Sequence, residues 1–305
     1  MKFRDPRELS TKLVIYTFIT IFLQLTAFKK SFSPNKLFCC RNFILNTYLY
    51  ISLMVSITLL TTTLINYFII KPKQDGKKSP LYNTLISPYT SIFIFIVLMG
   101  MLFLPIIYNP PINYGLTVWR HIWMYLFTFL FGITLSSIYI VYSAESIDNI
   151  MLITLLVTIG VTLLVYLKPS LIFILKLSNI LIGGLFCLIA LLIVNIFFRS
   201  TKLYHLISFA GIVIFTGLLL YDSKIIMMAS ELCVDYGQKL ANKDLLTSEM
   251  LTKYRRVKDF RIMMQQLKST SYTRPDYINY GLRVYLDIIN LFIYMLRLMG
   301  ESRFN

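Results

Sequence analysis

The sequence predicts an all-α polytopic membrane protein with seven transmembrane helices. Of its 305 residues, 57% are hydrophobic and 14% are charged, and the mean hydropathy is +0.69, a composition typical of membrane proteins. Short polar stretches separate long apolar runs, so we expect one bundle of helices rather than soluble domains with an anchor. The chain has no phosphate-binding loop of the Walker type and no G-x-S-x-G motif, and we therefore do not expect an enzyme.

Each predicted span satisfies the requirement of ~20 mainly apolar residues for a bilayer-crossing helix. A basic stretch, 71-KPKQDGKKSP-80, follows the first span, and a connection of some 50 residues precedes the last. In chain order, the predicted spans are about 43–70, 89–108, 119–142, 149–167, 171–198, 205–229 and 281–299.

Three segments lie outside these spans. Residues 1–42 form an N-terminal extension, in which the apolar run 13–28 is short for a span and could lie in the headgroups as an interfacial helix. The sixth connection carries a basic insertion, residues 231–274, and residues 300–305 form a C-terminal tail.

A basic amphipathic helix is predicted at 248–268 within the insertion, because apolar residues recur there at helical spacing and Lys and Arg lie largely around the other side. Such a helix could bind anionic lipid or an acidic partner, cell-death regulators among them. It could equally be a solvated helix that packs on the bundle's own loops.

The net charge of +16 does not predict nucleic-acid binding, because the basic residues lie between the spans. Of the 30 Lys and Arg residues, 22 fall on the side that carries the N-terminus and the sixth connection. The positive-inside rule places that side in the cytosol. Arg120 and His121, beside two tryptophans at the start of the third span, are expected to be interfacial anchors rather than ligands.

Two acidic residues lie inside predicted spans. Of the 14 Asp and Glu residues, only Asp222 and Asp287 are not at span ends or in connections. Asp222 is about seven residues before the end of the sixth span, and Asp287 is six residues after the start of the seventh. At 1.5 Å per residue both are ~10 Å from the same membrane face. If these antiparallel spans pack together, the two carboxyl groups meet.

Two carboxyl groups that meet in an apolar site cannot both ionise cheaply, so the pair shares a proton. When ionised, the pair offers oxygen ligands to a cation such as Ca²⁺. Arg283, Tyr221 and Ser223 are candidate supporting residues. In the alternative interpretation each Asp is satisfied separately, with Arg283 paired to Asp287 at i, i+4 spacing. Lys224 is expected to extend to the membrane surface.

The same two segments resemble a known family. The segment 281-GLRVYLDIINLFIYMLRLMG-300 closely resembles the last conserved block of the Bax inhibitor-1 family, also called the transmembrane Bax inhibitor motif or lifeguard proteins. The segment 211-GIVIFTGLLLYDSK-224 is similar to the family's G-x-x-x-F-x-G-x-x-x-YDT-Q, with Ser223 and Lys224 in place of Thr and Gln. Weaker matches extend the resemblance over about 43–299, and Phe131 stands where many members have an acidic residue.

The resemblance implies a seven-helix Bax inhibitor-1-like bundle with a pH-sensitive aspartate pair, Asp222 and Asp287. It further implies Ca²⁺ leak across an intracellular membrane, such as that of the endoplasmic reticulum or Golgi, and restraint of cell death. Ca²⁺ would be the permeant or bound ion, and no cofactor is expected. A second hypothesis is a non-conducting membrane regulator that binds cell-death or other membrane proteins.

Overall fold

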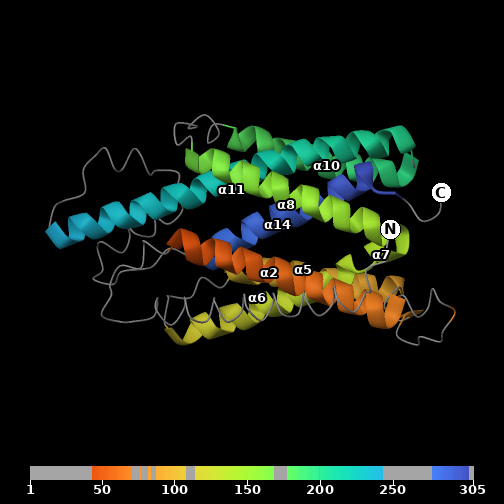
Figure 1. Ribbon diagram of the computed structural model, residues 1–305, viewed down its shortest axis with the longest axis horizontal. Helices are drawn as coiled ribbons and strands as arrows, with labels where there is room; N and C mark the ends of the chain where they lie inside the picture. Colours follow the sequence, from red (N-terminus) through yellow and green to blue (C-terminus); the bar gives the residue numbers. More distant parts are fainter. Residues whose placement is uncertain are drawn as a thin grey trace, which may run out of the picture. The chain divides into compact units, whose positions relative to one another are not determined.

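The computed structural model describes residues 43–70, 87–107, 114–167, 177–198, 200–242 and 277–301, with a few more between 71 and 86. Every regular element in these residues is a helix (Figure 1). The N-terminal extension and the basic helix expected at 248–268 lie outside them. The chain divides into two units: the described part of unit 1 runs from Leu49 to Ala144, and that of unit 2 covers residues 43–48 and 145–301.

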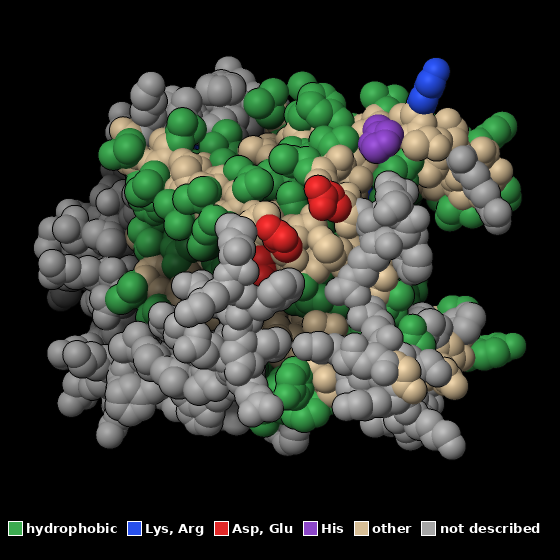
Figure 2. Space-filling view, turned by 45° about the vertical axis from the view of Figure 1, so that its right-hand side comes forward, with side chains coloured by type: hydrophobic (Ala, Val, Ile, Leu, Met, Phe, Trp, Pro, Cys, Tyr) green, Lys and Arg blue, Asp and Glu red, His purple; other side chains and the backbone are tan. Residues whose placement is uncertain are grey.

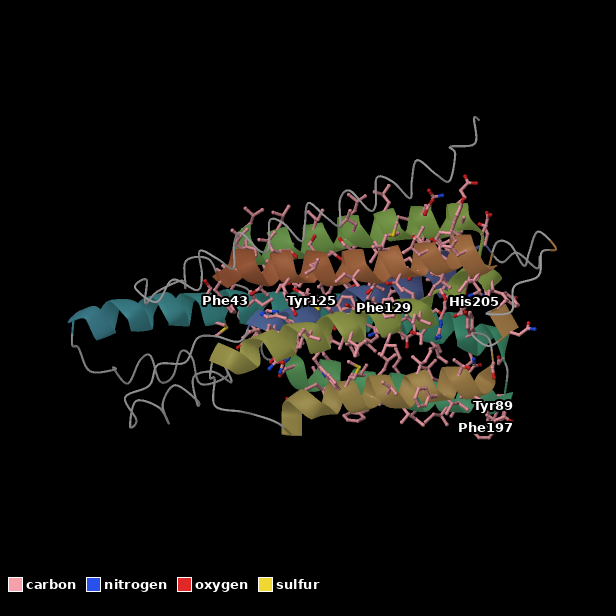
Figure 3. The ribbon with its side chains drawn as sticks, turned by 90° about the horizontal axis from the view of Figure 1, so that it is seen from below. Phe43, Tyr89, Tyr125, Phe129, Phe197 and His205 are labelled. Atoms are coloured by element: carbon pink, nitrogen blue, oxygen red, sulfur yellow. The ribbon has the colours of Figure 1, made fainter. Side chains whose placement is uncertain are left out.

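Five helices in the described residues are long and apolar enough to cross a membrane, which confirms a polytopic membrane protein. These candidate spans are Phe43–Ile70, His121–Val141, Ala144–Leu167, Ser178–Phe198 and Thr201–Ser230. Their side chains suit a lipid environment: Figure 2 shows mostly hydrophobic side chains on the face in view, with few charged ones. Figure 3 shows Phe197 at the end of α10, where its side chain is 80% exposed.

Unit 1 contains most of α2 and three further helices. Its elements are α2 (Phe43–Ile65), the π-helix η2 (Asn66–Ile70), α5 (Pro88–Ile107), α6 (Tyr114–Leu135) and α7 (Ile138–Val141). Threonine hydroxyls join α2 to α6, since Thr58 Oγ1 donates to Thr128 O at 3.3 Å and Thr62 Oγ1 donates to Gly132 O at 3.1 Å. Gly132 allows this approach, because a Cβ there would lie 2.8 Å from Thr61 Cβ.

The third predicted span, 119–142, is interrupted in the structure. A turn at Ser136 and Ser137 separates α6 from α7. Here the Ser136 hydroxyl donates to Ile133 O at 2.6 Å and the Ser137 hydroxyl donates to Thr134 O at 2.9 Å. Ser and Thr side chains offer the backbone such local alternatives to helical hydrogen bonds, and consecutive ones favour a break.

Unit 2 contains the start of α2 and four long helices. These are α8 (Ala144–Leu167), α10 (Ser178–Phe198), α11 (Thr201–Asn242) and α14 (Tyr277–Met299). α11 packs against both α10 and α14 (Figure 1). The end of α14 is tied to the start of α8, because the backbone N–H of Glu301 donates to Ser146 Oγ at 3.0 Å.

α11 is longer than the span expected at 205–229. Its 42 residues correspond to ~63 Å, and the helix continues for twelve residues beyond Ser230, through a stretch that carries Glu231, Asp235 and Lys239. Residues 231–242 contain no proline, and a helix already formed adds residues with little further cost. The first part of the predicted insertion, residues 231–242, is therefore a continuation of α11.

Candidate functional site

A close contact between α11 and α14 sets the distance between the two helices. A Cβ on Gly211 would lie 2.5 Å from ring carbons of Tyr294, so no larger residue fits there without movement. The Tyr294 ring stacks on Phe215, with 5.5 Å between centroids and 21° between planes. Arg297 lies over the same ring, 5.4 Å from its centroid. Tyr294 thus packs between two residues of α11 and one of its own helix.

The carboxyl groups of Asp222 and Asp287 meet across this interface. Asp222 lies twenty residues before the end of α11, and Asp287 lies ten residues after the start of α14, so each is more than two helical turns from the ends of its helix. The two carboxyl groups lie within hydrogen-bond reach of each other. Both are shielded from solvent, with 6% of Asp287 and 13% of the Asp222 side chain exposed.

A direct hydrogen bond between two carboxyl groups requires a proton, because ionised carboxylates only accept. The arrangement of Asp222 and Asp287 therefore corresponds to a pair that holds one proton. The second oxygen of Asp287, Oδ2, is buried and has no hydrogen-bond partner among the described residues. The pair consequently keeps one acceptor that no described group uses.

Arg283 supplies a positive charge to the pair. Its Nη1 lies 3.9 Å from Asp222 Oδ1, a long ion pair across the two helices. Arg283 is one turn before Asp287 on α14, yet the ion pair that it forms is with Asp222 rather than with its i+4 neighbour. Half of the Arg283 side chain is exposed, at 52%, so solvent screens this attraction. One proton and Arg283 together make the site electrically neutral.

The oxygens of the pair are suitable but insufficient ligands for Ca²⁺. Calcium takes six to eight oxygen ligands, and two carboxyl groups supply at most four. No group of three or more His, Cys, Asp or Glu residues that could hold a metal ion occurs in the described residues. A Ca²⁺ ion at this pair would therefore need several further ligands, such as water.

The other candidate residues near Asp222 lie apart from the hydrogen bond of the pair. Ser223 is fully buried, and its hydroxyl has no partner among the described residues, so it does not donate to either carboxyl group. Tyr221 is half-buried and, within the described part of the chain, makes no hydrogen bond to the pair.

Lys224 does not extend to the surface, and that prediction is wrong. The residue is 4% exposed, and its Nζ approaches Met227 Sδ at 3.9 Å. The helix continues to Asn242, so Lys224 is too far from the helix end for its side chain to reach beyond it.

His121 belongs to an aromatic cluster in unit 1. Its Nδ1 lies 3.3 Å from the hydroxyl of Tyr50, which is fully buried, and its ring stacks near Tyr125, with 6.3 Å between centroids. Phe131, on the same helix, packs near Phe127 at 6.0 Å. No pattern in the sequence indicates the contact between His121 and Tyr50, which joins residues 71 positions apart.

Comparisons with known proteins agree with the resemblance seen in the motifs. A sequence model of the family described as "Inhibitor of apoptosis-promoting Bax1" matches residues 40–304. The chain is 34% identical over 178 residues to an uncharacterized protein of Borreliella burgdorferi. It is 30% identical over 182 residues to the inner membrane protein YbhL of Escherichia coli K12.

The matches to the Borreliella burgdorferi and Escherichia coli proteins each cover 58% of this chain and 62% of the relative. The chain therefore spans about three fifths of the length of the curated relatives it matches. The comparisons support a membrane protein, and none of them supports the endoplasmic reticulum or Golgi in particular. Because the family's sequence model matches nearly the whole chain from residue 40 onward, the chain belongs to the Bax inhibitor-1 family.

Proposed function

We propose that this protein is a proton-modulated Ca²⁺ leak pathway in which Asp222 and Asp287 form the sensor. The observation that carries the proposal is that the two carboxyl groups, one on α11 and one on α14, lie within hydrogen-bond reach, so that one proton between them completes a hydrogen bond. This bond joins the two helices only while the pair holds a proton. Loss of the proton replaces an attraction between the helices by a repulsion.

The size of this change is sufficient to alter helix packing. Two unit charges about 4 Å apart repel by about 4 kcal/mol at an effective dielectric constant of about 20, and each 1.4 kcal/mol changes an equilibrium constant about tenfold. A repulsion of this size would favour a looser arrangement of α11 and α14. The same two negative charges would attract Ca²⁺, whose preferred ligands are oxygens.

The topology that we propose has seven spans, with α5 and α14 added to the five candidate spans. α5 has 20 residues and α14 has 23, which at 1.5 Å per residue gives ~30 and ~35 Å, enough to cross the hydrocarbon core. The distribution of Lys and Arg supports a cytosolic N-terminus. In this topology the carboxyl pair lies in the cytosolic half of the membrane.

Two further parts of the proposal depend on family membership. Inhibition of apoptosis-promoting Bax is what the family's description states, and for this chain we propose it on that basis alone. We propose that the protein acts without enzymatic chemistry. Two of its relatives are named as inner membrane proteins of Escherichia coli. We propose an inner membrane location if this chain comes from a bacterium of that kind, and an intracellular membrane if it comes from a eukaryote.

Flux through Ca²⁺-loaded liposomes tests the leak. The wild-type chain, Asp222→Asn and Asp287→Asn are reconstituted, and Ca²⁺ efflux is measured at steps over about pH 5 to 8. We expect wild-type flux to rise with pH, because proton loss separates the helices. We expect a flatter profile in each variant, because a single carboxyl group cannot form the shared-proton bond.

The matched control is Asp148→Asn, which removes an exposed acidic residue of α8 that takes no part in the pair. Its pH profile should match the wild type. Identical pH profiles in all four proteins would refute the sensor. Absence of flux at every pH in a folded wild-type protein would refute the leak and favour the non-conducting regulator.

A further inference from the structure

Three hydroxyl groups of unit 2 are buried without a hydrogen-bond partner in the described part of the chain. They belong to Tyr48 in the first turns of α2 and to Thr162 and Tyr166 in the last turns of α8. All three oxygens are buried, and none has a hydrogen-bond partner of good geometry among the described residues. The rings of Tyr48 and Tyr166 meet edge to face with 6.5 Å between centroids, and their hydroxyl groups lie close together.

Thr162 differs from the threonines that precede it on the same helix. Thr154 and Thr158 each donate to the carbonyl oxygen four residues earlier, both at 2.8 Å. This bond is the ordinary way for a threonine in an apolar helix to satisfy its hydroxyl. Thr162 has the same spacing and the same opportunity, yet does not make the bond. Its hydroxyl is therefore available to a group outside its own helix backbone.

Helix geometry places Thr162 and Tyr166 on one face. Residues four apart lie one above the other, and long helical side chains lean toward the N-terminal end. The Tyr166 side chain accordingly leans over the turn that carries Thr162. Because the Tyr166 ring also contacts Tyr48, Thr162 is expected to lie on the face of α8 that meets the first turns of α2.

We propose that Tyr48, Thr162 and Tyr166 form an internal water site that joins α2 to α8. A buried water molecule makes about three hydrogen bonds to polar groups that would otherwise lack partners, and three such groups are present here. Each hydroxyl can donate and accept, which suits water. None of the three side chains carries a charge, so a desolvated cation would find no compensating charge on them. Water is therefore the ligand that the chemistry favours.

The start of α2, which carries Tyr48, contacts the start of α14, the helix that carries Asp287. Phe43, at the start of α2, packs edge to face against Tyr280 near the start of α14, with 5.8 Å between ring centroids. Tyr48 is five residues beyond Phe43, and Asp287 is seven residues beyond Tyr280. Both groups are within about two helical turns of one contact. The existence of the water site does not depend on the proposed leak.

Radiolytic hydroxyl-radical labelling of the full chain in detergent tests the site, because bound water next to a side chain yields radicals there. We expect strong labelling of Tyr48 and Tyr166 relative to Tyr50, which is fully buried and already paired with His121. The decisive variant is Thr162→Val, which keeps the shape of the side chain and removes one water ligand. Labelling of Tyr166 should fall in this variant and stay unchanged in Thr158→Val.

Thermal unfolding of Tyr166→Phe provides a second readout that does not depend on labelling. Loss of a hydroxyl that binds water should lower Tm by about 2–4 °C. Loss of a buried hydroxyl without any partner should instead leave Tm unchanged or raise it. Unchanged labelling of Tyr166 in a folded Thr162→Val protein, or a Tm of Tyr166→Phe at or above the wild type, overturns the proposal.

Discussion

Replacement of Gly211 by alanine should destabilise the contact between α11 and α14. The new Cβ would lie 2.5 Å from ring carbons of Tyr294, whereas carbon atoms in contact are normally about 3.5–4.0 Å apart. The ring must therefore move by about 1 Å or more. It has little room to move, because it is 5% exposed and already stacks on Phe215.

The expected magnitude follows from two opposing effects. Forcing an extra methyl group into a packed interface costs about 1–3 kcal/mol, while alanine stabilises a helix interior by about 1 kcal/mol relative to glycine. Gly183→Ala is the matched control, because a Cβ at Gly183 of α10 has no atom within 4 Å. The helix-propensity effect is common to both variants, so their difference isolates the clash at about 1–3 kcal/mol.

Thermal unfolding of the purified variants in one detergent measures this difference. At about 2–4 °C per kcal/mol for chains of 150–250 residues, we expect Tm of Gly211→Ala to be at least about 2 °C below that of Gly183→Ala. Gly183→Ala itself should be as stable as the wild type or more stable. Equal Tm values for the two variants would show that the Tyr294 ring yields without cost, and the proposed contact would not fix the helix spacing.

Three further changes have distinct expected outcomes. Arg283→Gln should raise the pH at which Ca²⁺ flux increases, because loss of a positive charge favours the protonated pair; a shift to lower pH in the flux assay would contradict the ion-pair geometry. Gly132→Ala should lower the free energy of unfolding by about 1–3 kcal/mol, and with it Tm, because the new Cβ would lie 2.8 Å from Thr61 Cβ. An unchanged Tm would contradict this. Ser146→Ala removes the acceptor of the Glu301 N–H and should speed hydrogen exchange at that amide, at a cost of about 0.5–1.5 kcal/mol.

The apolar helices were predictable because a helix that crosses the membrane must have a certain length and a mainly apolar composition. The fourth predicted span, 149–167, ends where α8 ends at Leu167, and the second, 89–108, differs from α5 by one residue at each end. Helix length beyond the membrane was not predictable in the same way. Charged residues begin to recur along α11 at Glu231 and Asp235, but helical hydrogen bonds continue past that change in composition.

The depth of the two aspartates could be predicted, and their contact could not. Counting residues gives the level of Asp222 and Asp287 within their helices, since the rise per residue is fixed. Whether the helices are adjacent depends on side-chain packing, here on Gly211 and Tyr294, 83 positions apart in the sequence. Tyr48 and Tyr166 were missed for a related reason: in a chain with 21 tyrosines, composition does not distinguish those whose hydroxyls lie buried without partners.

The charge count at the carboxyl pair explains how an apolar interface tolerates two acidic residues. With one proton on the pair, the remaining carboxylate and Arg283 have opposite charges that cancel, and the carboxyl hydrogen bond satisfies a donor inside the helix contact. Without that proton the site carries one net negative charge in surroundings that disfavour it. A cation can restore the balance, and so can a proton. Because both act on the same oxygens of Asp222 and Asp287, proton binding and cation binding must compete at this pair.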